Sequence, residues 1–144
     1  MSSLSRGVFR LAAAVLFPAV TALSPTQVFG ETFQVPGDRA RTIRQAIALA
    51  DANTDTSNII ELATGTYTEN LEITKSLTIR GDSGAKVVIR AASSDPLIQI
   101  GGATSAVTLE RLILRTAGTG VLINSAASVI LRNLVITLAS TAVQ

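Results

Sequence analysis

Histidine, cysteine and tryptophan are absent from the sequence, and each absence excludes a class of chemistry. Without histidine, Ser-His-Asp and Cys-His nucleophilic systems are excluded, and the commonest metal ligand is missing. Without cysteine the chain has no disulfide and no thiolate site, so its stability must come from packing and backbone pairing. Aromatic residues make up only 3% of the sequence, which leaves no stacking platform for nucleic acid bases.

The first thirty residues have the order of charges and apolar residues that is typical of a secretory signal peptide. Arg6 and Arg10 precede an apolar run at 11–23, and Val28 and Gly30 follow it near the expected cleavage point. The run has 13 residues, whereas a membrane span needs about 20, so a retained anchor is the less favoured alternative. We expect a signal peptide at 1–30 and a secreted protein, periplasmic or at the cell surface, with no membrane span after cleavage.

Removal of this segment would leave a chain without net charge. The sequence has 12 Lys and Arg residues and 10 Asp and Glu residues, and Arg6 and Arg10 are the only charged residues of the signal segment. The remaining chain therefore carries ten residues of each sign. Because it has no basic excess, we expect no nucleic acid as a partner.

A helix is predicted at residues 42–52. An apolar stripe with helical spacing runs through this segment and consists of Ile43, Ala46, Ile47 and Ala50. Thr42 with Gln45 three positions later fits a capping box, which predicts where the helix begins.

From Ile59 onward the sequence consists of short aliphatic runs, and it repeats itself after 22 residues. The matching pairs are Val107 and Val129, Leu109 and Leu131, Leu112 and Leu134, Leu114 and Ile136, and Val121 and Val143. A period of this length with three short strands per repeat is typical of a solenoid, whose coils bury their inward faces by stacking. We expect strands of about three to five residues, turns at "SGAK", "AGTG" and "SAAS", and about four coils over residues 59–144.

The predicted fold class is therefore an all-β solenoid, a right-handed parallel β-helix with an N-terminal capping α-helix. A leucine-rich repeat is the nearest alternative, but its Asn ladder and long connecting arm are not evident. We expect residues 31–144 to hold the N-terminal cap and the first about four coils. Because no capping element follows Arg132, the sequence also suggests a fragment that is incomplete at its C-terminus.

The segments "TIRQAI" and "IIELATGTYTENLEITKSLTIRGDSGAKVVI" resemble the N-terminal region of a group of parallel β-helix families. These are the pectin methylesterase, pectate lyase and carbohydrate-binding/sugar-hydrolase (CASH) families, and the matching positions are Gly65, Tyr67, Glu69, Lys75, Leu77, Ile79 and Gly81. The resemblance covers most of residues 36–144. It implies a pectin lyase-like fold and a polysaccharide-active or polysaccharide-binding protein, but no particular reaction, because such a region opens enzymes, binding proteins and adhesins alike.

No catalytic, cofactor-binding or metal-binding residue is assigned, and no cofactor follows from the sequence. The resemblance implies sites of Asp, Arg and Lys residues on the outer faces of central coils. The charged residues in the predicted coils are Arg80, Asp82, Lys86, Arg90, Asp95, Glu110, Arg111, Arg115 and Arg132. Asp82 and Asp95 fall at different turns, and we interpret Glu69 as a surface or turn-bonding residue rather than a catalytic carboxylate. The chain alone is expected to be inactive, while a full-length parent could be a lyase, an esterase or a hydrolase.

Two further relationships follow from the repeat. Glu110 and Arg132 are 22 residues apart and are predicted to stack as an opposite-charge pair, which would contribute about 0.2–1 kcal/mol. The last predicted coil would leave aliphatic residues beside unpaired strand edges, so we expect self-association there; they are Val129, Leu131, Leu134 and Ile136. The alternative to a polysaccharide-active or polysaccharide-binding protein is a surface structural or adhesive protein without catalytic activity, because aliphatic, neutral coils with few aromatic residues suit it at least as well.

Overall fold

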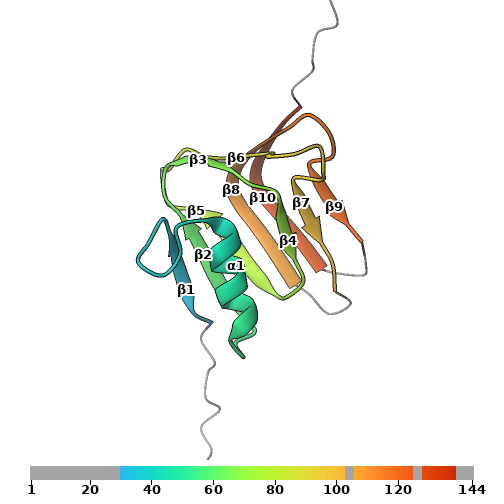
Figure 1. The fold of residues 1–144 in the computed structure, drawn as a ribbon. Coiled ribbons are helices and arrows are strands. Elements are labelled where there is room, and N and C mark those ends of the chain that lie inside the picture. The colour runs from blue at the N-terminus through green and yellow to red at the C-terminus, as the bar shows by residue number, and fades with distance from the viewer. Residues whose placement is uncertain (1–29, 103–105, 125–127, 139–144) are drawn as a thin grey trace, which may run out of the picture.

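A computed structural model describes residues 30–102, 106–124 and 128–138. Residues 1–29 of the predicted signal peptide, residues 125–127 of the "SAAS" turn and Val143 of the predicted repeat lie outside these residues. The described residues form one helix and ten strands (Figure 1). In chain order they are β1 (Thr32–Val35), α1 (Ile43–Ala52), β2 (Asn58–Leu62), β3 (Gly65–Thr68), β4 (Leu71–Ile73), β5 (Leu77–Gly81), β6 (Val87–Arg90), β7 (Ile98–Ile100), β8 (Ala106–Thr116), β9 (Val121–Ile123) and β10 (Ser128–Leu138).

The strands form two parallel sheets. The larger sheet has seven strands in the order β1-β2-β5-β8-β6-β3, with β10 also paired to β8. The smaller sheet has the order β4-β7-β9. Figure 1 shows α1 in front of the larger sheet and beside β4, with β7 and β9 on the side away from β1. The helix contacts β1, β2 and β4, so it packs against both sheets at one end of the molecule.

The predicted fold class, an all-β solenoid in the form of a right-handed parallel β-helix, is wrong. The hydrogen-bonded order of the larger sheet runs from β1 to β3 without returning to its start, so neither sheet of the described residues closes on itself. Together with α1, the parallel sheets make a mixed arrangement of the α/β kind. The predicted strand length is also wrong for β8 and β10, which have 11 residues each.

The reason for this difference lies at two positions with left-handed backbone conformation. Arg111 in β8 has φ 55° and Asn133 in β10 has φ 50°. Such a residue bends a strand sharply. Pairing continues on both sides of the bend, because the first half of β8 pairs with β5 and its second half with β6. The sequence predicts two short strands in each of these segments, but the backbone forms one bent strand in each, β8 and β10.

Several local predictions are confirmed. The helix begins at Ile43 after the N-cap Thr42, whose side chain accepts a hydrogen bond from the Gln45 backbone, and the predicted apolar stripe is buried. The 22-residue repeat sets the register of β8 against β10, where Val107 lies beside Val129 and Leu112 beside Leu134. Turns occur at "SGAK" and "AGTG" as predicted.

The core lies between the two sheets and α1. Its largest fully buried side chains come from all three: Ile43, Ile60, Leu62, Leu71, Ile73, Ile79, Ile89, Leu97, Ile98, Ile100, Leu109 and Leu112. Burial of this many aliphatic side chains, at about 1.5–3 kcal/mol each, is the main stabilising contribution in a chain without disulfides. Within the described residues, no helix is long and apolar enough to cross a membrane.

Large aliphatic side chains are exposed to solvent on β9 and β10. This β9/β10 face consists of Leu122, Ile123, Ile130, Leu131, Val135, Ile136 and Leu138. The exposed fraction reaches 56% at Val135 and 65% at Leu138. Leu131 and Ile136, two of the residues predicted to be presented there, are confirmed as exposed, whereas Val129 and Leu134 are partly buried against the core.

Candidate functional site

The residues that carry the family resemblance hold the two ends of α1. The Glu69 carboxylate accepts hydrogen bonds from the backbone N–H groups of Ile43 and Arg44, at 3.1 and 3.0 Å. At the other end, the Lys75 ammonium donates to the backbone carbonyls of Ala50 and Asn53. A negative group at the N-terminus and a positive group at the C-terminus both complement the helix dipole. The sequence indicates a surface or turn-bonding role for Glu69, and the structure shows its carboxylate bonded to the N-terminus of the helix instead of a turn.

Tyr67 hydrogen-bonds to the backbone at the end of β1 and just before β3. Its hydroxyl lies 2.9 Å from the carbonyl oxygens of both Val35 and Ala63, so it ties β1 to the start of β3. Burial raises the pKa of Tyr67, and the nearby Glu69 carboxylate raises this pKa further. These motif residues therefore position the helix and the first strands.

A groove lies beside the helix, and we call it the α1 groove. Its volume is about 500 Å³, and it is lined by Arg44, Ile47, Ala48, Asp51, Asn70, Leu71, Glu72, Asp95, Pro96 and Gln99. Glu72 in β4 and Gln99 in β7 lie side by side in the register of the smaller sheet. Their side chains have no hydrogen-bond partner among the described residues. The groove therefore offers a free carboxylate and a free amide to a ligand.

Asp51 adds a second carboxylate from the helix side of the groove. Burial raises the pKa of Asp51, and the positive charge of Lys75 acts in the opposite direction. Asp51 is nevertheless exposed at the surface. We assign no acid–base role to it, because no reacting group is positioned against it.

Asn70 holds the loop at 91–97 that forms the far wall of the groove. Its Oδ1 accepts the backbone N–H groups of Ala92 and Ser93, at 2.8 and 3.0 Å. Its Nδ2 donates to the carbonyls of Asp95 and Pro96, both at 3.0 Å. All four hydrogen-bonding positions of this amide are used, so one side chain bonds four backbone groups of the wall. This role was not foreseen from the sequence, where an isolated Asn before a strand gives no such signal.

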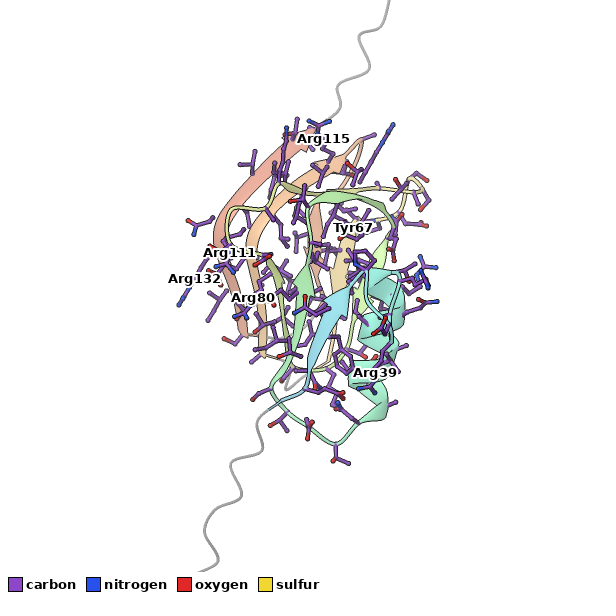
Figure 2. All side chains as sticks on the ribbon, turned by 90° about the vertical axis from the view of Figure 1, so that its left-hand side faces the viewer. Arg39, Tyr67, Arg80, Arg111, Arg115 and Arg132 are labelled. Atoms are coloured by element: carbon purple, nitrogen blue, oxygen red, sulfur yellow. The ribbon has the colours of Figure 1, made fainter. Side chains whose placement is uncertain are left out.

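The predicted charge pair belongs to a longer row of charged residues on the larger sheet. Neighbouring strands bring Glu61, Arg80, Glu110 and Arg132 together in register, with alternating sign. Arg80 Nε lies 3.1 Å from Glu61 Oε1. The stacking of Glu110 beside Arg132 is confirmed, but the ion pair of Glu110 is made with Arg111, at 2.5 Å. Figure 2 shows Arg80, Arg111 and Arg132 along one side of the molecule.

The two coil-region aspartates are not brought together. Asp82 follows β5 and accepts the Ser83 N–H at 2.6 Å, while Asp95 lies in the 91–97 loop and accepts the Ser93 hydroxyl at 2.9 Å. Among the described residues, no group of three or more acidic residues is placed to hold a metal ion. Both aspartates thus bond within their own loops.

Comparisons of the chain with protein-family models, with curated proteins and with solved structures give no match. The resemblance to the pectin methylesterase, pectate lyase and CASH families therefore stays a prediction, and the function must be argued from the geometry of the site.

Proposed function

We propose that the protein is secreted and binds polysaccharide in the α1 groove. The observation that carries this proposal is the pair of unpartnered polar side chains, Glu72 and Gln99, side by side on the groove wall. Sugar hydroxyls both donate and accept hydrogen bonds, so a carboxylate next to an amide can bind adjacent hydroxyls of one ring. The predicted signal peptide supports an extracellular ligand.

The polarity of the groove also suits a sugar ligand. A ligand site for a small apolar molecule is mostly enclosed and apolar. Here the wall is polar on both sides, with Asp51 on the helix and Asp95 on the loop, and the floor is formed by the short aliphatic residues Ile47 and Leu71. We propose binding alone, because the groove shows no nucleophile and base in contact.

The second candidate is a surface structural or adhesive protein, and the β9/β10 face favours it. Exposed aliphatic side chains next to the edge of a parallel strand are typical of surfaces that pair with another chain. In this reading self-association through β10 is the function, and the α1 groove is only a surface feature. The two candidates differ in which end of the molecule matters.

Affinity electrophoresis in gels containing neutral and acidic polysaccharides tests the first candidate. We expect at least one polymer to retard the 144-residue protein, and the double variant Glu72→Ala, Gln99→Ala to lose most of this retardation. Asp38→Ala is the matched control, because Asp38 is an exposed acid outside the groove. If the control loses as much as the double variant, or no polymer retards the protein, the groove is not a polysaccharide site.

A further inference from the structure

A second row of residues crosses the larger sheet, and its charges are not balanced. Thr68 in β3, Arg90 in β6, Arg115 in β8 and Thr137 in β10 lie side by side in register. In the row that contains Glu61, every arginine has a carboxylate on a neighbouring strand. Here two arginines are neighbours and the flanking residues are neutral.

Neither arginine is neutralised by an acidic side chain among the described residues. The ion pairs of the described residues involve Arg39, Arg80 and Arg111. Arg90 and Arg115 are both exposed, and their guanidinium groups have no hydrogen bond or ion pair with a described residue. Like charges directly opposite each other on paired strands destabilise a sheet. An anion between the two guanidinium groups would remove this repulsion.

The space for such an anion is present. A hollow of about 380 Å³ is lined by Arg90, Ala91, Ala92, Ser93, Arg115, Thr116 and Ala117. Three of these are alanines, so no large side chain fills the room beside the guanidinium groups. Figure 2 shows Arg115 at the end of the molecule, well apart from Arg80, Arg111 and Arg132.

The backbone under this hollow is held in place. The Ala91 N–H donates to the Arg115 carbonyl at 3.0 Å, which joins the ends of β6 and β8. Asn70 holds the next two residues, Ala92 and Ser93, through their N–H groups. The two arginines therefore extend from neighbouring, fixed points of the backbone.

We propose that Arg90 and Arg115 bind an oxyanion group, a sulfate or a carboxylate, carried by an acidic polysaccharide. A guanidinium group is planar and presents its N–H donors as a fork that matches the oxygens of such anions. The 91–97 loop forms a wall of both this hollow and the α1 groove, so one polymer can contact both. The polymeric part of the inference rests on the proposed function, whereas the anion site rests on the arginine pair alone.

Thermal unfolding of the 144-residue protein in sodium sulfate, against sodium chloride of equal ionic strength, tests the anion site. We expect sulfate to raise the Tm of the wild-type protein, and Arg90→Gln and Arg115→Gln to weaken the apparent sulfate affinity by about tenfold. Arg132→Gln is the matched control, since it removes the same charge from the other row and should respond to sulfate as the wild type does. Equal sulfate responses of all four proteins would overturn the proposal.

Retention on dextran, carboxymethyl-dextran and dextran sulfate tests the polymer, because the three share one backbone and differ in charge. We expect retention by at least one charged polymer and not by dextran, with both site variants eluting at lower salt than Arg132→Gln. A sulfate-dependent Tm without retention by any polymer keeps the anion site and rejects its polysaccharide ligand. Retention that Arg132→Gln weakens as much as Arg115→Gln does would show general charge attraction and overturn the site.

Discussion

Glu69 Oε1 accepts the backbone N–H of Ile43 at 3.1 Å, although the two residues are 26 positions apart. The Glu69 carboxylate, which directly follows β3, thus accepts an N–H group that has no partner within the first turn of α1. At the C-terminal end of α1, the Lys75 ammonium donates to the Ala50 carbonyl. The helix is therefore fastened to the strands that follow it in the sequence, and this attachment positions the α1 groove.

Replacing Glu69 should destabilise the protein. Glu69→Ala removes two hydrogen bonds from helix N–H groups and the favourable charge at the N-terminus, so we expect a loss of about 1–2 kcal/mol. Urea unfolding followed by circular dichroism measures it. Glu72 is an exposed acid on β4, the next strand in the sequence, and has no partner among the described residues. Glu72→Ala should therefore change stability by less than about 0.5 kcal/mol. Equal losses for both variants would contradict the assigned role.

Tyr67 should make stability depend on pH in the alkaline range. Its pKa is raised in the folded protein, so the folded state holds the phenol proton more tightly than the unfolded state does. The resulting stabilisation is fully present below the ordinary pKa of 10.0 and is lost as the pH rises through the folded pKa. Tyr67→Phe should lose this component of the alkaline fall in Tm, although it is less stable at neutral pH.

The chain contains one tyrosine, so its titration can be followed by the ultraviolet absorbance of tyrosinate. We expect a midpoint above 10.0 in the native protein and a lower midpoint in Glu69→Gln, because the Glu69 charge contributes to the raised pKa. A native midpoint at the value of the urea-unfolded chain would refute the raised pKa.

Leu112 and Arg115 should differ sharply in their tolerance of a carboxylate. Leu112 is 1% exposed and lies beside Leu134, so Leu112→Asp should cost well over about 2 kcal/mol by burying an unpaired charge. Arg115→Asp lies on the exposed side of the same strand and places an acid beside Arg90, so its cost should be small. Similar shifts in Tm for the two variants would be inconsistent with this register.

The helix and the register of β8 against β10 could be predicted from the sequence, because both follow from a regular spacing of apolar residues. The stripe from Ile43 to Ala50 has helical spacing, and the 22-residue repeat fixes which residues of β8 and β10 are neighbours. The joining of strands into sheets could not be predicted in this way. It depends on the left-handed backbone of Arg111 and Asn133, and side-chain type gives only a weak signal for that conformation in an arginine.

The candidate sites were not predicted for a related reason. Arg90 and Arg115 are 25 residues apart, which is not the repeat length, yet the bend in β8 brings them side by side. A search of the sequence at the repeat spacing finds the pair Glu110 and Arg132 and passes over the arginines. Glu72 and Gln99 are missed in the same way, since the connection between β4 and β7 is longer than one repeat.

The β9/β10 face should cause self-association. Its aliphatic side chains are exposed beside an edge strand, so we expect the protein to associate at micromolar concentrations. Val135→Lys or Thr137→Lys should reduce this without unfolding the earlier strands, because both positions are exposed. Sedimentation velocity measures the effect, and Lys in place of the exposed Thr66 on β3 is the control. A wild-type monomer at tens of micromolar, on the order of concentrations at which exposed edges aggregate, would refute the expectation.

The 144-residue chain should show no turnover of pectin-like polymers, with or without calcium. The reason is that Asp82 and Asp95 bond within separate loops and no histidine is available as a base. Release of reducing ends, unsaturated products or methanol is the measurement. Turnover above a protein-free blank that Asp82→Ala or Asp95→Ala abolishes would show that one of these loops is a catalytic site.

The hydrogen bonds from Glu69 and Lys75 to α1 also affect how the protein unfolds locally. The helix has 10 residues, fewer than the roughly 12–15 that an isolated helix needs to be even marginally stable in water. Its amides at Ile43 and Arg44 are bonded to Glu69, and its last carbonyls to Lys75. Fraying from either end would have to break these tertiary bonds first. We therefore expect the helix and the segment at 69–75 to open and close as one cooperative unit, in which exchange of the helix amides with solvent reports the release of that segment.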